Sequence, residues 1–361
     1  MKKSRKKSTL EEKEGVSPPG ITSAPAVEKV KAIRKKPPNP EALARRIIQG
    51  DKVALSRAIT LMESTREEHT EAARTLIEQC LPYADNSVRI GITGVPGVGK
   101  STFIEVFGTF LTSRGKKVAV LAVDPSSSRS GGSILGDKTR MEALTRDENA
   151  FIRPSPSGDT PGGVARKTRE AVILCEACGF DTILIETVGV GQGETAVHSM
   201  VDFFLLLQLA GAGDELQGIK RGIMEVADAI VIHKADGENI KAARRARTDF
   251  MRALRLYPPK ANGWSPEVLT ASSVTGEGIA EIWALIDGYV EKDKENGFFT
   301  RRRLRQNTRW LLQTVEERLK AGFFRHPGVK VQLKPLLKAV ENNEISPFAA
   351  ARKLFEAYEN G

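Results

Sequence analysis

The chain is poor in cysteine, histidine and aromatic residues, and it has no long hydrophobic run. There are three cysteines and four histidines among 361 residues. Three cysteines cannot build a disulfide framework in a chain of this length, which favours a reducing, cytoplasmic setting. The most apolar stretch, residues 203–210, is far shorter than the roughly 18 residues that a membrane-spanning helix needs. We therefore expect neither a disulfide-stapled protein nor a membrane span.

The excess of positive charge is confined to one end of the chain. The net charge is +10, but residues 1–36 contain eleven Lys/Arg and four Glu and so contribute +7. The remainder is nearly balanced, so no nucleic-acid partner is expected. Residues 1–38 are rich in Lys, Ser and Pro, and we predict a disordered basic tail. They lack the apolar segment of a secretory signal, and their glutamates are atypical of a mitochondrial presequence.

Residues 94–101 read GVPGVGKS and fit the phosphate-binding pattern G-x-x-x-x-G-K-[ST] at every fixed position. A short alternating strand pattern precedes them, and residues 102–112 carry apolar side chains at helical spacing. This strand–loop–helix context predicts a nucleoside triphosphate site rather than a glycine-rich turn that merely links two elements. The expected binding residues are Gly94, Val95, Pro96, Gly97, Val98, Gly99, Lys100, Ser101 and Thr102.

Each residue type in this loop has a physical role. The three glycines let backbone N–H groups turn inward around an anion, and the N-terminus of the following helix adds a positive dipole end. We expect Lys100 to reach the β- and γ-phosphates and the Ser101 hydroxyl to ligate Mg²⁺.

Apolar strand patterns alternate with amphipathic helix patterns from about residue 87 to 288. This alternation predicts an α/β P-loop domain, a mostly parallel sheet with helices on both faces. Helical periodicity also predicts a helical region over residues 39–86 and a C-terminal helical region over 289–361 for dimerisation or partner binding. The expected strands are residues 89–93, 118–123, 150–153, 182–186, 203–209, 229–233 and 267–271, and the expected C-terminal helices are 301–319, 335–340 and 347–358.

Two carboxylates bracket a serine- and glycine-rich loop that follows the second predicted strand. Asp124 comes directly after that strand, and Asp137 lies near the end of the loop. Carboxylates that face a triphosphate need a divalent cation between them, so we assign both to the Mg²⁺ shell and Asp137 also to catalysis. The composition is typical of a switch ordered by the γ-phosphate. The alternative is that both aspartates are turn or cap residues.

The predicted strand 182–186 ends in Glu186, followed by Thr-Val-Gly. This is an acid-x-x-Gly switch, with Glu where most such proteins carry Asp. We expect Glu186 to hold a magnesium-bound water and the N–H of Gly189 to contact the γ-phosphate. Gln192 is a candidate for orienting the attacking water, although it is equally well a surface residue.

The identity of the base follows from His233-Lys234-Ala235-Asp236 at the end of another apolar strand. An Asp here accepts two hydrogen bonds from guanine, whereas adenine leaves it unpaired, a mismatch worth around 10⁴-fold. Lys234 offers its stem to the purine face. GTPases usually carry Asn or Thr at position 233, and His does not copy the Asn amide, so we expect weakened guanine affinity with specificity retained. Ser272 and Ser273 fit the last guanine loop.

Cys175 and Cys178 form a C-x-x-C near the end of a helical pattern. Zinc would need two further ligands, and none of the histidines lies nearby in sequence. A buried apolar stripe of the helix is the favoured interpretation.

Taken together, the motifs resemble the MeaB/ArgK/MMAA type of P-loop GTPase, the methylmalonyl-CoA mutase-associated proteins. The resemblance covers roughly residues 40–300. It depends on five strings: GITGVPGVGKST, VLAVDPSSSRSGGSILGDKTRM, FIRPSPSGDTPGGVARKTRE, ETVGVGQGE and GAGDELQGIKRGI. These are far more specific than the phosphate-binding loop alone, because GTPases in general share neither the loop after Asp124 nor residues 211–223.

The resemblance implies a homodimeric, Mg²⁺-dependent GTPase that is a chaperone of an adenosylcobalamin-dependent acyl-CoA mutase. Such a protein gates cofactor loading and protects or reactivates the mutase. The resemblance matches Asp214, Glu215 and Lys220 to a segment that couples nucleotide state to the partner. The family's phosphate and magnesium positions match Lys100, Ser101, Asp124, Asp137 and Glu186.

Three other functions remain open within this class. A metal-insertion GTPase would be expected to carry a Cys/His cluster or a His-rich tail, which the four scattered histidines disfavour. A transport-associated kinase would need an acceptor pocket that the sequence does not indicate. A nucleotide-dependent assembly protein without meaningful turnover is the third.

Overall fold

A computed structural model of the chain describes residues 39–64, 66–123, 141–155, 161–187, 194–211 and 221–359. The predicted basic tail lies outside the described residues. Residues Pro40–Gly361 form one unit.

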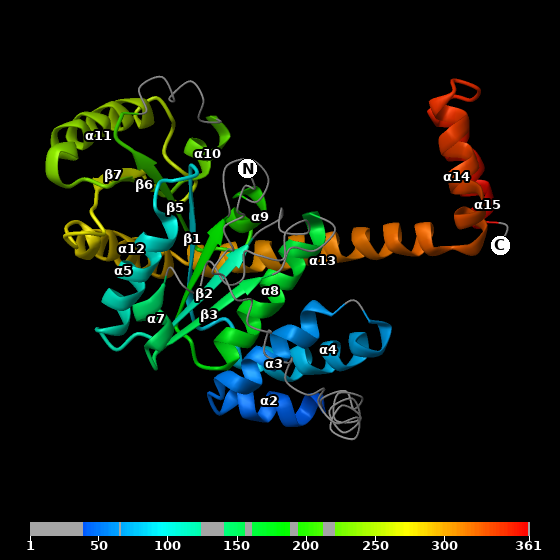
Figure 1. Ribbon diagram of the computed structural model, residues 1–361, viewed down its shortest axis with the longest axis horizontal. Coiled ribbons are helices and arrows are strands. Elements are labelled where there is room, and N and C mark those ends of the chain that lie inside the picture. Colours follow the sequence, from blue (N-terminus) through cyan, green and yellow to red (C-terminus); the bar gives the residue numbers. More distant parts are fainter. Residues whose placement is uncertain are drawn as a thin grey trace, which may run out of the picture. The chain divides into compact units, whose positions relative to one another are not determined.

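A parallel sheet forms the centre of this unit (Figure 1). The described residues supply seven strands in the order β3-β2-β4-β1-β5-β6-β7, and every neighbouring pair is parallel. All seven predicted strands are confirmed, with ends that differ by two residues at most. Their bounds are β1 Val88–Gly94, β2 Val118–Val123, β3 Ala150–Ser155, β4 Thr182–Thr187, β5 Phe203–Leu209, β6 Ala229–His233 and β7 Glu267–Thr270.

Alternate residues of the central strands enter two separate apolar clusters, which explains why the strands read as continuous apolar runs. Val118 and Val120 of β2 face the cluster that contains α5 (Lys100–Thr112), α7 (Glu142–Arg146) and α12 (Ile279–Glu295). Ala119 and Leu121 face the opposite cluster with α8 (Pro161–Ala177). Helices α10 (Arg221–Val226) and α11 (Ile240–Leu254) pack on the other end of that second face. The predicted α/β fold with helices on both faces is confirmed.

The helices before the sheet pack on α8. They are α2 (Pro40–Ile48), α3 (Lys52–Glu63) and α4 (Glu67–Cys80), followed by the short turn η1 (Leu81–Tyr83). Asp51 caps α3 by accepting hydrogen bonds from the N–H groups of Val53 and Ala54. Leu55 and Ile59 of α3 are buried in the cluster shared with α8.

The cysteines belong to this apolar cluster. Cys175 of α8, Cys178 just beyond its end and Cys80 of α4 are all free and buried. Burial raises the pKa of the Cys178 thiol to about 11. The buried positions of Cys175 and Cys178 are those expected if the C-x-x-C is part of an apolar helix face.

The chain ends in three helices, α13 (Phe298–Arg325), α14 (Pro327–Glu341) and α15 (Pro347–Glu359). The prediction that a helix starts at residue 335 was wrong: Pro335 is inside α14, and Pro327 at the first turn is the true start signal. None of the helices in the described ranges is both long and apolar enough to cross a bilayer.

A buried ion cluster fixes the first turns of α13 to the sheet. The guanidinium of Arg303, 2% exposed, lies 2.6 Å from the Asp202 carboxylate and 2.5 Å from that of Asp85. Glu176 of α8 completes the cluster 3.6 Å away and also pairs with Arg89 of β1. Because each charge is paired, the desolvation cost is offset, and removal of one partner would leave another charge buried and unpaired.

Candidate nucleotide-binding site

The predicted phosphate-binding loop connects β1 to α5, as its motif requires. Three of its glycines have positive φ: Gly94 at 156°, Gly97 at 78° and Gly99 at 92°. A Cβ on Gly94 would lie 2.5 Å from the carbonyl oxygen of Leu207 in neighbouring β5. Glycine is needed at this position because another strand's backbone approaches it closely.

Lys100 begins α5 and is 9% exposed. Its Nζ donates a hydrogen bond to the carbonyl oxygen of Gly94 at 2.9 Å. Burial lowers the pKa of this amine, while the carboxylates of Glu186 and Glu194 act in the opposite direction. The lysine is thus a cation held within the loop by neutral carbonyl groups.

The hydroxyl of Ser101 donates to Oε1 of Glu186 at 3.4 Å. Glu186 is 7% exposed and lies on β4, which is between β1 and β2. The strand order therefore brings together a serine and a glutamate separated by 85 residues. Two oxygen ligands at this spacing are the donor set that Mg²⁺ prefers.

A second contact joins the same two strands. The hydroxyl of Thr187, at the end of β4, donates to the hydroxyl of Thr93 on β1 at 2.8 Å, and both side chains are fully buried. Sequence reasoning missed this pair and also Glu194, the first residue of α9 (Glu194–His198). The only sequence feature that could have indicated Glu194 is its position as the acidic residue at the end of the glycine-rich string ETVGVGQGE.

His233 connects β6 to the phosphate-binding loop. Its Nδ1 lies 2.7 Å from the carbonyl oxygen of Val98, and its Nε2 lies 2.7 Å from Oγ of Ser273. A carbonyl oxygen only accepts, so Nδ1 carries the proton and Nε2 accepts from the serine. Burial lowers the pKa of His233 and keeps the ring neutral. The ring also meets Phe103 edge-on.

The other guanine-motif residues surround the same region. Lys234 has a left-handed φ of 57° and donates from Nζ to the carbonyl oxygen of Gly97 at 3.0 Å. The Ser272 hydroxyl donates to Oδ2 of Asp236 at 2.5 Å and accepts from the N–H of Val274. The serine loop thereby orients the carboxylate that the sequence assigns to guanine.

The structure brings most of the predicted site residues together. Pro96 and Gly97 are exposed at the tip of the loop, Val95 is half-buried, Val98 is buried and Thr102 is exposed on α5. The remaining predicted positions lie outside the described residues; they are Asp124, Asp137, Gly189, Gln192, Asp214, Glu215 and Lys220.

Comparisons with known proteins show the family to which the chain is related. The family model "Methylmalonyl Co-A mutase-associated GTPase MeaB" matches residues 55–327. A putative GTPase of Caulobacter vibrioides is 54% identical over 88% of this chain and 97% of its own. The GTPase ArgK of Escherichia coli is 46% identical over 86% and 94% of the two chains.

Two further relatives extend the comparison. The mitochondrial methylmalonic aciduria type A homolog of Mus musculus is 44% identical over 87% of this chain and 78% of its own. A crystal structure named as a LAO/AO transport system kinase superimposes with a TM-score of 0.71 at 40% identity, covering 90% of this chain and 99% of that one.

Proposed function

The chain belongs to the MeaB family of methylmalonyl-CoA mutase-associated GTPases, and we propose that it is a chaperone of an adenosylcobalamin-dependent acyl-CoA mutase. It is a P-loop GTP hydrolase, as its relatives are named. The proposal adds that hydrolysis depends on Mg²⁺, that it gates cofactor loading, and that it protects or reactivates the mutase. The observation that supports this proposal most directly is a pair of hydrogen bonds made by the phosphate-binding loop. Ser101 is hydrogen-bonded to Glu186 of β4, and Val98 is hydrogen-bonded to His233 of β6.

Binding of the triphosphate uses groups that are already in place. The loop's backbone N–H groups and the α5 N-terminus attract the phosphates. Lys100 exchanges the Gly94 carbonyl for phosphate oxygens, so its buried charge gains an anionic partner. At the base, Asp236 accepts from guanine N1–H and the 2-amino group.

The side chains present fit a magnesium ion. Ser101 and Glu186 supply adjacent oxygens, and we assign Asp124 and Asp137 to the same shell. Bound magnesium would neutralise charge that develops on the phosphates during hydrolysis. Gln192 is the proposed residue that orients the attacking water.

For the mutase to sense the bound nucleotide, the change from GTP to GDP must alter the surface of this chain that the mutase contacts. Glu186 and Thr187 end β4, and α9 begins seven residues later. A change at Ser101–Glu186 therefore occurs at the end of β4, where the predicted acid-x-x-Gly switch begins. The mutase must bind the two resulting arrangements with different affinity. The description of the matching family, which names methylmalonyl-CoA mutase, supports this partner.

Self-association is proposed for the C-terminal region, residues 289–361. Its helices expose large apolar side chains that a lone chain would leave in water. An apolar cavity of about 510 Å³ also lies between α13 and α15. We infer a homodimer. The most exposed of these side chains are Leu304, Leu311, Leu312, Leu319, Val331 and Phe348.

The proposed organisation is a helical region over residues 39–86, a GTPase domain over 87–288 and the C-terminal region. We propose a cytoplasmic setting, because the three cysteines do not make a disulfide framework. We propose no nucleic-acid partner, because the net positive charge is concentrated in residues 1–36. We propose no membrane partner, because the sequence has no apolar run long enough to span a bilayer.

The activity test compares GTP and ATP with and without Mg²⁺. Slow Mg²⁺-dependent GTP turnover, hardly any ATP turnover and loss of both in Lys100→Ala are expected. ATP turnover equal to GTP turnover would refute the base assignment.

The kinase alternative, which the name of the similar crystal structure favours, has its own test. When the protein is incubated with GTP labelled in its γ-phosphate, the label should appear in inorganic phosphate and never on an added amino acid or protein.

A further inference from the structure

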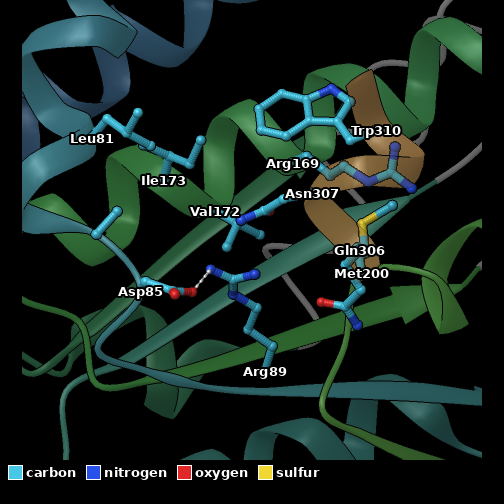
Figure 2. A pocket seen from close by; sticks show the side chains of 11 residues that line it. Leu81, Asp85, Arg89, Arg169, Val172, Ile173, Met200, Gln306, Asn307 and Trp310 are labelled. Atoms are coloured by element: carbon cyan, nitrogen blue, oxygen red, sulfur yellow. Dashed lines mark hydrogen bonds and ion pairs between the residues drawn. The ribbon is translucent and has the colours of Figure 1, made fainter. Parts of the chain in front are cut away.

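We propose that a cavity between η1, α8 and α13 binds a small organic monoanion, a carboxylate joined to an apolar body. The cavity has a volume of about 490 Å³ (Figure 2). It is separate from the nucleotide site, since none of the predicted nucleotide-binding residues lines it. No role in GTP hydrolysis is needed for this site.

One wall of the cavity is apolar. Val172 and Ile173 come from α8, Leu81 from η1, and Met200 from the segment after α9, and the Trp310 ring of α13 completes the wall. Figure 2 shows these side chains around a space toward which the Asn307 amide points from α13. This wall gives favourable burial to an aliphatic or aromatic body.

The other wall contains a buried cation that has no counter-charge among the described residues. Arg169 of α8 is 7% exposed, and its two terminal nitrogens donate to neutral acceptors, Oε1 of Gln313 at 2.7 Å and Oγ of Ser199 at 2.6 Å. Its Nε has no hydrogen-bond partner among the described residues. No described carboxylate lies within ion-pair distance of this guanidinium.

The electrostatic surroundings make this charge costly. Burial lowers the pKa of Arg169, and the nearby Arg309 lowers it further, with only partial compensation from Glu317. A buried guanidinium without an anion pays a desolvation penalty that an anionic ligand would offset. By contrast, Arg89 in the same cavity is already paired with Glu176.

A second donor on the cavity wall also lacks a partner. Nε1 of Trp310 is buried and unbonded within the described part of the chain, as is the acceptor Oε1 of Gln306. Two free donors and a positive charge match the two oxygens of a carboxylate. The Gln306 oxygen and the Asp85 carboxylate, which also line the cavity, disfavour a second negative charge. The ligand is therefore a monoanion.

The test is calorimetric titration of the GDP-saturated full-length protein with octanoate, and in parallel with octan-1-ol. Octanoate should bind saturably and at least about tenfold more tightly than the alcohol, because only it pairs with the buried cation. Arg169→Gln should abolish this preference. The matched control Arg318→Gln removes an exposed arginine of α13 and should bind octanoate as the wild type does.

Two further variants keep the test decisive if Arg169→Gln fails to fold. Asn307→Trp, at an exposed position on the cavity wall, should block entry and reduce octanoate affinity at least about tenfold. Lys100→Ala should bind octanoate normally, since the phosphate-binding loop is elsewhere. No saturable binding, equal binding of the alcohol, unchanged binding in Asn307→Trp or loss in Lys100→Ala would each overturn the proposal.

Discussion

His233 on β6 donates from Nδ1 to the carbonyl oxygen of Val98 in the phosphate-binding loop, 2.7 Å away. The second ring nitrogen accepts from Ser273 in the last guanine loop. One side chain thus joins three segments that are predicted to contact different parts of a guanine nucleotide. Neutral imidazole offers one N–H donor and one acceptor nitrogen, which are the two groups that these bonds require. The expectation of weakened guanine affinity stays a prediction. The histidine nevertheless joins these segments through its two ring nitrogens, which we call its linking role.

His233→Ala should therefore weaken GDP binding by about tenfold or more, because two buried hydrogen bonds are lost and the Val98 and Ser273 groups lose their partner. His233→Asn restores a residue usual at this position in GTPases and should bind GDP at least as tightly as the wild type. Titration with a fluorescent GDP analogue measures both. His326→Ala, at the junction of α13 and α14, is the control and should bind normally. Equal binding by wild type and His233→Ala would contradict the linking role.

The pH dependence of stability offers a second test. Burial lowers the pKa of His233 below its ordinary 6.5, so the folded state resists protonation more than the unfolded chain does. The unfolded chain binds the extra proton as pH falls below 6.5, and stability must fall with it. Replacement by Asn removes this dependence. Urea unfolding at pH 8 and pH 5.5 should show a smaller loss for His233→Asn than for the wild type; identical losses would exclude the effect.

Glu170 of α8 predicts the opposite pH behaviour. Burial raises the pKa of its carboxyl to about 7, although the positive charge of Arg166 acts to lower it. The group is protonated in the fold at pH values where the unfolded chain has already ionised it. Its contribution is therefore fully present below about pH 4.5 and is lost as pH rises through 7.

Glu170→Gln should accordingly be more stable than the wild type at pH 8.5, by up to about 3 kcal/mol. At pH 5 the difference that arises from ionisation should shrink to about 1 kcal/mol or less. Free energies of unfolding at both pH values measure the difference. A gain that is equal at pH 5 and pH 8.5 would show that ionisation of this carboxyl is not its cause.

Alanine substitutions can distinguish a glycine that the backbone requires from one that another residue can replace. Gly94→Ala places a Cβ 2.5 Å from the Leu207 carbonyl oxygen and should destabilise the protein by roughly 2–3 kcal/mol and impair nucleotide binding. Gly288→Ala, in an exposed turn of α12 with nothing within 4 Å, should stabilise by up to about 1 kcal/mol. Thermal unfolding compares them, and equal effects would argue against the close approach.

The sheet was predictable because its strands are short apolar runs buried on both faces, bounded by motifs of known geometry. The ends of β2, β5 and β6 coincide with their predicted ends. Contacts between segments far apart in sequence were not predictable in the same way. The Thr93–Thr187 and His233–Val98 bonds span 94 and 135 residues, and neither leaves a local pattern.

The Arg169 cavity illustrates the same limit. Its lining comes from η1, α8 and α13, from Arg89 of β1 and from loop residues such as Met200. None of these stretches carries a sequence pattern that indicates a binding site. Only the packing of α13 on α8 makes Arg169 a buried cation rather than an exposed one. The bounds of α13 were also underestimated: it starts at Phe298 after Gly297, which has a φ of 70°. A glycine in that conformation at a helix N-cap is not a typical start signal.

The central claim is that nucleotide state sets the affinity for a cobalamin-dependent mutase. Its most direct test is the dissociation constant between this protein and the purified mutase of the same organism, measured with GDP and with a non-hydrolysable GTP analogue in the presence of Mg²⁺. We expect the two dissociation constants to differ by at least about fivefold, and we expect Lys100→Ala to remove the difference. Equal affinities in the two nucleotide states, or no complex in either, would contradict it.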